Sequence, residues 1–258
     1  MEPHPPIDPE VRMFAQHTLQ PLGWLTAARA RLPVDAAEEP LPWWTYPAIE
    51  FIATWVRPEM RVFEYGGGHS TLWWAERVQQ VITVDHDQNW VTKVAGRLSS
   101  PHQITCVAAN RRSRDAQTAI APYRDYFDRS PRTNFPYDAT RITQRGLNDA
   151  DFLGYVDTIN QQPGLFDCIV IDGMARRLCA HAAVPKLKAD GIILFDNSNR
   201  SDYLEGYQHL TRCGFAQIRL WGSVPGATFP SCSSIFLRDV RALPQLDFQP
   251  SLFDFPEY

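Results

Sequence analysis

Several features that would assign a chain to a class of protein are missing from this sequence. Its five cysteines are scattered, odd in number and form no Cys-x-x-Cys pair, which favours a reducing, cytoplasmic setting with most of them as small core residues. No stretch reaches the roughly 18 apolar residues of a membrane span. Residues 1–6 lack the basic start and apolar run of a signal peptide. We therefore expect a cytoplasmic protein with no membrane partner.

A strong net charge is missing as well. The formal charge is -4, which gives no general attraction to nucleic acid, so we expect no nucleic-acid partner. The charge does not predict an oligomeric state. What the chain does have is length and apolar content, because 258 residues that are 44% hydrophobic can bury the core of one α/β domain.

The expected organisation is one domain with two appendages. Residues 1–42 hold eight of the 21 prolines and are predicted to form a Pro-rich N-terminal arm. Residues 43–240 are the expected domain, and 241–258 are a tail that either docks on it or stays mobile. Within the domain, segment 111–147 is rich in Arg, Asp, Pro and Tyr and has no clean period, which is typical of an insertion that acts as a substrate lid or binding loop.

Residues 61–74 contain the central motif of the sequence, a strand followed by a glycine turn and the start of a helix. An apolar run ends at three successive glycines, 66–68, and Ser70 stands where a helix N-cap is expected. A strand, a tight turn and a helix start suit a nucleotide-like ligand. The glycines let the backbone approach the ligand closely, and the first helical turn offers free N–H groups.

The remaining pattern alternates strands with helices. Further apolar runs that predict strands lie at 81–85, 104–109, 168–172 and 192–196. Amphipathic segments separate them, which predicts parallel strands with helices on both faces of the sheet. The last two expected strands, 215–221 and 233–237, are joined by a connection too short for a helix and therefore favour an antiparallel hairpin.

Polar residues follow most of these strands, and in an open α/β sheet the ligand lies beyond the carboxyl ends of the strands. Besides the glycines they are Glu64, Asp85, His86, Asn110, Asp172, Asp196 and Asn197. Asp85 ends the strand after the glycine loop, which suits a carboxylate that accepts hydrogen bonds from two ribose hydroxyls. The alternative is that Asp85 is a loop or capping acid.

A glycine loop followed by an acid also occurs in nicotinamide and flavin enzymes. Two details count against those classes. Thr71 occupies the place of the third glycine in G-x-G-x-x-G, and a terminal hairpin is foreign to the usual dehydrogenase sheet.

Four segments together resemble the ordered motifs of class I S-adenosylmethionine-dependent methyltransferases. They are Glu64-Tyr-Gly-Gly-Gly-His-Ser, Asp85, Phe166-Asp-Cys-Ile-Val-Ile-Asp-Gly and Leu187-Lys-Ala-Asp-Gly-Ile-Ile-Leu-Phe-Asp-Asn. The resemblance runs from about residue 42 to 237. Within the family, the chain most resembles bacterial members known mainly as predicted methyltransferases. The resemblance implies an α/β fold with a Rossmann-like, doubly wound sheet of about seven strands, mostly parallel, with an antiparallel last strand.

The same resemblance implies S-adenosyl-L-methionine as the cofactor. It places Glu64 and the glycines at the methionine part of the cofactor and Asp85 at its ribose. Asn110 is our expectation beside the adenine, although the acid usual at that position is absent. The expected cofactor-binding residues are Glu64, Gly66, Gly67, Gly68, Asp85, His86 and Asn110.

Methyl transfer from a sulfonium mainly needs a positioned acceptor and a base for any proton that the acceptor carries. The candidate catalytic residues are Asp172, His69 and Arg176. Two of them have alternative roles, because His69 could be a local hydrogen-bonding residue and Arg176 could pair with a strand-end carboxylate. The alternative for His69 also applies to His86.

Asp172, Asp196 and Asn197 also resemble the magnesium site of catechol-type O-methyltransferases. One hypothesis is that Mg²⁺ binds these residues and acidifies a hydroxyl acceptor. The alternative is that the three side chains are hydrogen-bond anchors for loops.

The favoured function is therefore an S-adenosylmethionine-dependent methyltransferase that acts on a small molecule, with an oxygen acceptor preferred because of the possible metal ligands. Two alternatives stay open. One is a nicotinamide-dependent oxidoreductase, and the other is a non-catalytic binding protein on the same fold.

Overall fold

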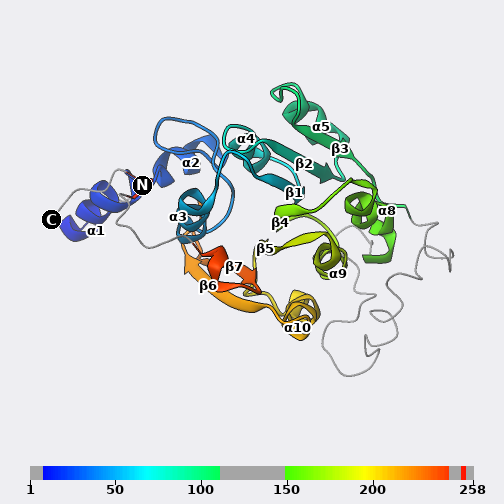
Figure 1. Ribbon diagram of the computed structural model, residues 1–258. Helices are drawn as coiled ribbons and strands as arrows, with labels where there is room; N and C mark the ends of the chain where they lie inside the picture. Colours follow the sequence, from blue (N-terminus) through cyan, green and yellow to red (C-terminus); the bar gives the residue numbers. More distant parts are fainter. Residues whose placement is uncertain (1–7, 111–148, 244–250, 254–258) are drawn as a thin grey trace.

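The computed structural model describes residues 8–110, 149–243 and 251–253, so the predicted 111–147 insertion lies outside the described residues. Within these ranges one sheet of seven strands forms the centre of the molecule, in the order β3-β2-β1-β4-β5-β7-β6 (Figure 1). The strands are β1 (Arg61–Tyr65), β2 (Gln80–Asp85), β3 (Gln103–Cys106), β4 (Phe166–Ile171), β5 (Leu187–Phe195), β6 (Ala216–Gly222) and β7 (Ser231–Leu237).

The central strands are apolar along their length because helices cover both of their faces. Strand β1 pairs in parallel with β2 and with β4, and Phe63 lies opposite Ile82 on one side and Ile169 on the other. The order reverses at β1, since β2 lies on one side of it and β4 on the other. A ligand site is expected above this reversal, beyond the carboxyl ends of the strands.

Strand β7 is antiparallel to both of its neighbours, β5 and β6. The connection from β6 to β7 spans only eight residues, 223–230, which leaves no room for a crossover helix. The predicted fold class is thus confirmed, as a mostly parallel Rossmann-like sheet of seven strands with an antiparallel last strand.

The helices form two layers around the sheet. The longer ones in the domain are α3 (Tyr46–Trp55), α4 (His69–Ala75), α5 (Gln88–Ala95), α8 (Leu153–Asp157), α9 (Arg176–Ala183) and α10 (Leu204–Arg212). Short helices η4 (Asp149–Phe152), η5 (Thr158–Gln161), η6 (Val184–Lys186), η7 (Ser201–Tyr203) and η8 (Val240–Ala242) flank them. No helix in the described part of the chain has both the length and the apolar content needed to cross a membrane.

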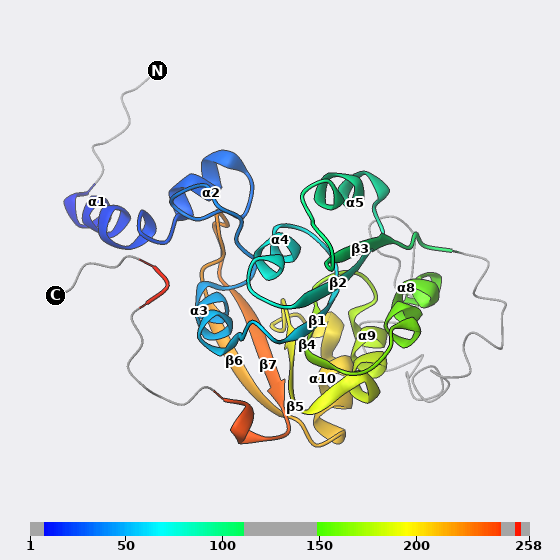
Figure 2. The ribbon, with the colours of Figure 1, turned by 45° about the horizontal axis from the view of Figure 1, so that its top comes forward.

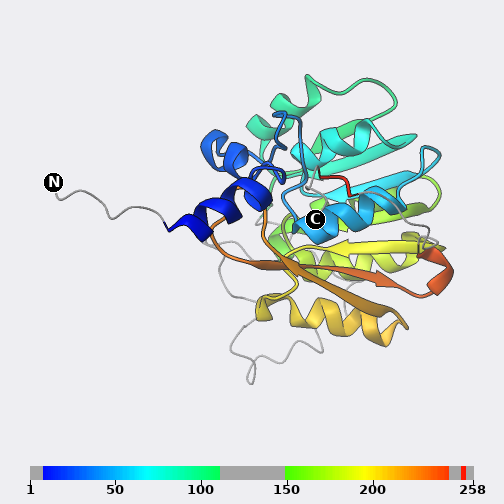
Figure 3. The same ribbon diagram turned by 90° about the vertical axis from the view of Figure 1, so that its left-hand side faces the viewer.

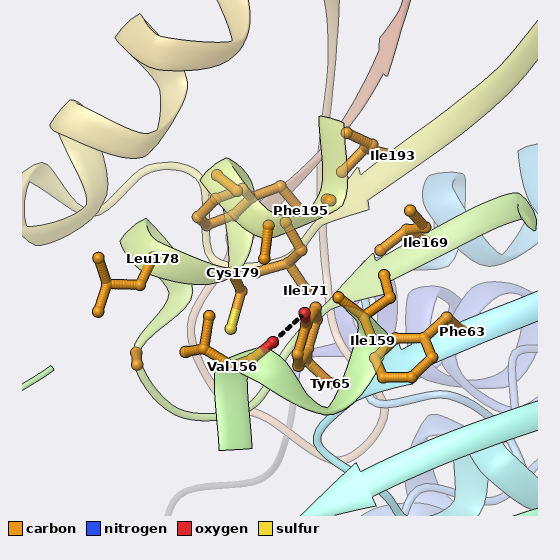
Figure 4. Packing of buried hydrophobic residues seen from close by; sticks show 14 of the residues in the cluster. Phe63, Tyr65, Val156, Ile159, Ile169, Ile171, Leu178, Cys179, Ile193 and Phe195 are labelled. Carbon is orange, nitrogen blue, oxygen red and sulfur yellow. Dashed lines mark hydrogen bonds between the residues drawn. The ribbon is translucent and has the colours of Figure 1, made fainter. Parts of the chain in front are cut away.

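Strand alternation divides the core into two clusters. Phe63 and Tyr65 point to the face covered by α8, α9 and α10, whereas Val62 points to the face covered by α3 and α4. Figure 4 shows the first cluster, in which the Tyr65 hydroxyl donates to the Val156 carbonyl at 2.7 Å. This bond joins the last residue of β1 to α8 and so positions the start of the glycine loop.

The N-terminal arm contains α1 (Pro9–Phe14), a π-helix η1 (Ala15–Leu19) and α2 (Trp24–Ala30). Helix α1 lies at the outer end of the arm, away from the sheet (Figures 2 and 3), and none of its residues is buried. From Leu22 onward the arm packs on the domain, because Leu22 and Leu41 belong to the core cluster under α3. At the other end of the chain, Phe253 is buried edge-on against Tyr46.

Three local predictions were wrong. Helix α4 begins at His69, so Gly68 occupies the N-cap position and Ser70 does not. Strand β3 ends at Cys106 instead of 109, and β5 begins at Leu187, five residues before the predicted start. The early start of β5 follows from Pro185, which lies in the short helix η6 that closes α9 and returns the chain to the sheet.

Candidate functional site

A cleft of about 1030 Å³ opens at the carboxyl ends of β1, β2, β4 and β5. One half is lined by the glycine loop and by Asp85 and Trp90. The other half is lined by the 196–203 and 224–231 segments and by residues of the arm. Of the predicted site residues, the cleft brings together Gly66, Gly67, Gly68, His69, Asp85, His86, Asp172, Arg176, Asp196 and Asn197.

The glycine loop needs its first glycine for a steric reason. Gly66 has φ of +92°, and a Cβ built there would lie 2.6 Å from the backbone of Gly173. The two glycines are therefore in direct backbone contact, at the ends of β1 and β4. This contact closes the floor of the cleft between the two strands at which the sheet order reverses.

Asp85 is held in place by backbone donors and still faces the cleft. Its Oδ2 accepts from the Gly67 N–H at 2.9 Å and its Oδ1 from the Asp87 N–H at 2.8 Å. His86 Nδ1 lies 3.3 Å from Oδ1. Burial alone would raise the pKa of Asp85, but the contacts with His86, Asp87 and Gly67 outweigh it and lower the pKa. A carboxylate has about four lone-pair positions, of which the two backbone N–H groups use two, and His86 Nδ1 makes no hydrogen bond within the described residues, so Asp85 retains capacity for two ribose hydroxyls.

Trp90 is a cleft residue that was not among the predicted site residues. Its indole N–H donates to the Gly67 carbonyl at 2.6 Å, and its ring lies 3.5 Å from where a Gly68 Cβ would be. Trp90 therefore covers the loop and orients the peptide between Gly67 and Gly68, whose N–H donates to Thr71 Oγ1 at 3.0 Å. Its position shortly after Asp85, on the helix that Asp87 caps, is the only sequence signal that points to it.

Glu64 does not line the cleft. It is fully buried behind the loop, where its Oε2 accepts from Thr71 at 2.5 Å and from Thr83 at 3.0 Å, while Oε1 has no hydrogen-bond partner within the described ranges. Thr71 in turn accepts from the Gly68 N–H at 3.0 Å. Burial raises the pKa of Glu64 to about 7. The expected contact of Glu64 with the cofactor is therefore replaced in this structure by an indirect role, since it ties the loop to β1.

Asp172, Arg176 and Asp196 form one network across the ends of β4 and β5. Arg176 donates to the Gly173 carbonyl at 3.0 Å, to the Asp196 carbonyl at 2.6 Å, and to the carbonyl and Oδ1 of Asp172 at 2.6 and 2.9 Å. Burial would lower the pKa of Arg176, but Asp172 raises it. The guanidinium therefore donates to oxygens of the protein itself. This agrees with the alternative role of Arg176, in which it pairs with a strand-end carboxylate.

The two carboxylates of the network lie close to each other in a buried setting. Burial and the neighbouring Asp196 raise the pKa of Asp172, and burial raises that of Asp196. Trp44 donates to Asp172 Oδ2 at 3.0 Å, while Ser233 and Asn197 donate to the two oxygens of Asp196, each at 2.6 Å. Every carboxylate oxygen of the pair therefore has a donor from the protein itself.

The magnesium hypothesis does not fit this donor set. Mg²⁺ requires oxygen ligands with free lone pairs in octahedral geometry. Here the carboxylates of Asp172 and Asp196 share the charge of Arg176, and Asn197 directs its amide N–H₂ at Asp196. Among the described residues, no group of three or more His, Cys, Asp and Glu side chains is arranged to hold a metal ion. The alternative reading, in which these residues anchor loops, agrees with the contacts.

His69 connects the glycine loop to the arm. Its Nδ1 lies 2.7 Å from the Pro33 carbonyl, and because a carbonyl only accepts, Nδ1 must carry the hydrogen. The neutral ring then has its lone pair on Nε2, which makes Nε2 the basic nitrogen. His69 could therefore act as a base while it also makes the local hydrogen bond that was the alternative for it.

Asn110 is not among the residues that line the cleft. Its backbone N–H donates to the Asp151 carbonyl at 2.7 Å, which places it beside η4. The expectation that it lies beside an adenine finds no support in this position. Residues missed by the sequence reasoning line the cleft instead, among them Trp43, Asn199, Arg200, Tyr203 and Phe229.

The strand order β3-β2-β1-β4-β5-β7-β6 with an antiparallel β7 is the arrangement implied by the motif resemblance. The chain has the class I methyltransferase fold. It matches no protein-family model and no curated protein sequence. The assignment of the fold to this class rests on the strand order and on the loop after β1.

Solved structures similar to this class I fold include proteins of several kinds. One is a methyltransferase-like protein from Silicibacter pomeroyi DSS-3, with 18% identity, coverage of 74% of this chain and 84% of that chain, and a TM-score of 0.41. Precorrin-6y C5,15-methyltransferase from Geobacter metallireducens GS-15 has 11% identity, coverage of 75% and 87%, and a TM-score of 0.46. An rRNA methylase from Streptococcus thermophilus has 10% identity, coverage of 73% and 93%, and a TM-score of 0.44. These likenesses assign no acceptor to the chain.

Proposed function

We propose that the protein is an S-adenosylmethionine-dependent methyltransferase that acts on a small-molecule acceptor. The observation that carries the proposal is the arrangement of Gly67 and Asp85. The loop N–H fixes the carboxylate at the end of β2, and the carboxylate keeps lone pairs toward a cleft above the reversal of strand order. A ribose with two hydroxyls matches those acceptors, and the methionine part would lie along the glycine loop.

The chemistry asks little of the protein beyond placement. An acceptor atom attacks the methyl carbon of the sulfonium in line with the carbon–sulfur bond, that bond breaks, and its electrons return to sulfur as a neutral thioether. If the acceptor carries a proton, His69 Nε2 is the proposed base, because Nδ1 is bound to the Pro33 carbonyl. The Asp172–Arg176–Asp196 network supplies a rigid wall rather than a proton-transfer group.

The preference for an oxygen acceptor depended on magnesium. Because Asp172, Asp196 and Asn197 use their side chains within the protein, that reason no longer applies. The proposal therefore covers small-molecule acceptors without a preference for the acceptor atom.

The two alternative functions are less well supported. In the usual dinucleotide-binding sheet the strands are mostly parallel, in the order 3-2-1-4-5-6, whereas here the strand next to β5 is antiparallel. A non-catalytic protein that binds only the cofactor would not require a cleft that extends beyond the half lined by the glycine loop and Asp85. In this structure it continues to the 224–231 segment and the arm.

A comparison of ligands tests the function. S-adenosylhomocysteine should raise the melting temperature of the protein, whereas NAD and NADP should not, because Thr71 replaces the third glycine of the dinucleotide motif and the strand next to β5 is antiparallel. A rise with a nicotinamide dinucleotide and none with S-adenosylhomocysteine would overturn the proposal. If S-adenosylhomocysteine binds, transfer of labelled methyl from S-adenosylmethionine into pooled small molecules distinguishes an enzyme from a binding protein.

A further inference from the structure

The half of the cleft that faces away from the glycine loop has an apolar wall that is exposed. Trp43, Phe229 and Leu32 line it and are 54%, 67% and 41% exposed, respectively. Val224, Ala227 and Pro230 extend the same wall. Large apolar side chains gathered around a concave site mark a place where an apolar ligand binds.

The wall is held rigidly by two indole hydrogen bonds, one from the arm and one from Trp43 at the start of the domain. Trp24 Nε1 donates to the Ala227 carbonyl at 2.9 Å, and Trp43 Nε1 donates to the Pro225 carbonyl at 3.0 Å. Both indoles hold the segment between β6 and β7. The exposed Trp43 ring is therefore fixed at the cleft, which lowers the entropy cost of using it to contact a ligand.

Arg200 lies at the adjoining side of the same half. Ser231, at the end of the apolar wall, donates to the neighbouring Asn199 side chain at 3.2 Å and so joins the wall to this loop. The Arg200 backbone is anchored as well, since its N–H donates to the Asn197 carbonyl at 3.0 Å and its carbonyl accepts from the Tyr207 hydroxyl at 3.2 Å. Its guanidinium lies 5.5 Å from the centre of the Tyr203 ring.

Two guanidinium groups contact Tyr203, but only one of them is available to a ligand. Arg176, 5.2 Å from the ring centre, is buried and donates to protein oxygens. Arg200 is exposed, and no carboxylate in the described part of the chain lies within ion-pair distance of it. Among the described residues, Arg176 and Arg200 are the two Arg or Lys side chains that line the cleft, so Arg200 is the cation available within that part of the chain.

We propose that the acceptor is a small aromatic carboxylic acid, with its ring against Trp43 and Phe229 and its carboxylate bound by Arg200. The guanidinium can hold a carboxylate through two parallel hydrogen bonds. A singly charged group fits better than a phosphate dianion, because four acids, Asp85, Asp87, Asp172 and Asp196, line the same cleft. This inference names the acceptor class for the proposed methyltransferase and rests on that function.

The test uses a matched pair of probes that share the ring and differ in one group, which is a charged acceptor in one probe and a neutral amide in the other. Binding of 4-fluorophenylacetate and of its neutral amide, 4-fluorophenylacetamide, is followed by fluorine NMR with and without S-adenosylhomocysteine. The carboxylate should bind about tenfold more tightly than the amide, because the charged hydrogen bonds are lost with the amide. Arg200→Gln should remove that difference.

Arg219→Gln is the matched control variant. Arg219 lies over Trp221 on β6, outside the cleft but in the groove that also contains Arg200, so the substitution changes the net charge equally. It should leave the preference for the carboxylate unchanged. Trp43→Leu should weaken the carboxylate and the amide by a similar factor, since both share the ring.

Three results would overturn the inference. They are equal binding of the two probes to the wild-type protein, failure of the carboxylate probe to bind, and an Arg200→Gln protein that keeps the preference. A loss of S-adenosylhomocysteine affinity in Arg200→Gln as large as the loss for the probe would also assign Arg200 to the cofactor carboxylate instead. S-adenosylhomocysteine binding without any preference between the probes would refute only the acceptor class. A carboxylate preference without S-adenosylhomocysteine binding would refute the methyltransferase function.

Discussion

The indole N–H of Trp44 donates to Oδ2 of Asp172 across 3.0 Å and joins residues that are 128 positions apart in the chain. Trp44 lies just before α3 and is fully buried, while Asp172 follows β4 at the floor of the cleft. Arg176 occupies the other oxygen of the same carboxylate. The segment that enters the domain and the end of a central strand are therefore fixed to one another at the candidate site.

Trp44→Phe should destabilise the protein because it leaves Asp172 without one of its two side-chain donors. The cost of the missing bond to a charged acceptor is about 1–3 kcal/mol beyond the loss of apolar volume. Trp74→Phe is the matched control, since Trp74 is equally buried and its indole N–H has no hydrogen-bond partner among the described residues. Urea unfolding measures both. Equal loss of stability in the two variants would show that the Trp44–Asp172 bond contributes nothing.

Gly66→Ala should destabilise the protein by about 3 kcal/mol or more, because it combines a strained backbone with a clash against Gly173. Gly214→Ala separates the two effects. Gly214 also has a positive φ, of +84°, but nothing lies within 4 Å of an added Cβ. It should therefore lose only about 1 kcal/mol. Thermal or urea unfolding that ranked the two variants equally would argue against the close contact between the loops.

Glu64 should make stability depend on pH. Its pKa is raised from 4.5 to about 7 by burial, so the folded state holds a proton that the unfolded state has released. Stability due to this group is present below pH 4.5 and is lost as the pH rises to about 7. The wild-type stability minus that of Glu64→Gln should therefore fall by about 3 kcal/mol across this window. Because other titrating groups are common to both proteins, a constant difference would contradict the burial of a titrating Glu64.

Magnesium should have no effect on the folded protein. Arg176, Trp44, Ser233 and Asn197 already donate to the carboxylates of Asp172 and Asp196. Addition of MgCl₂ should leave the melting temperature unchanged relative to NaCl of the same ionic strength, both with and without S-adenosylhomocysteine. A rise that Asp196→Asn abolishes would restore the metal hypothesis.

The strand pattern could be predicted because the central strands are buried on both faces and therefore appear as apolar runs. The position of Asp85 could be predicted for a related reason. Asp85 ends the apolar run of β2, and the glycine loop follows the apolar run of β1. The direction of Glu64 follows from alternation, which places it on the same face as Val62 and hence inside the protein. Strand alternation alone therefore predicts a buried Glu64, whereas the motif resemblance implied that Glu64 contacts the cofactor.

Other parts of the site depend on contacts between distant segments, which no local pattern encodes. Trp43 and Trp44 are neighbours, yet Trp44 binds Asp172 while Trp43 holds Pro225. The magnesium prediction failed because the sequence shows two acids and an amide but not that Arg176 lies between them. Arg200 was missed because its availability only becomes clear once the ion pairs around it are known.

The most direct test of the central claim is a calorimetric titration of the protein with S-adenosylhomocysteine. The wild-type protein should bind it. Asp85→Ala should lose at least about tenfold in affinity while keeping its fold, because two ribose hydroxyls lose a charged acceptor. Asp85→Asn, which retains one acceptor oxygen for the Gly67 N–H, should fall between the two. Unchanged affinity in a folded Asp85→Ala protein would contradict the assignment of the loop and Asp85 to this cofactor.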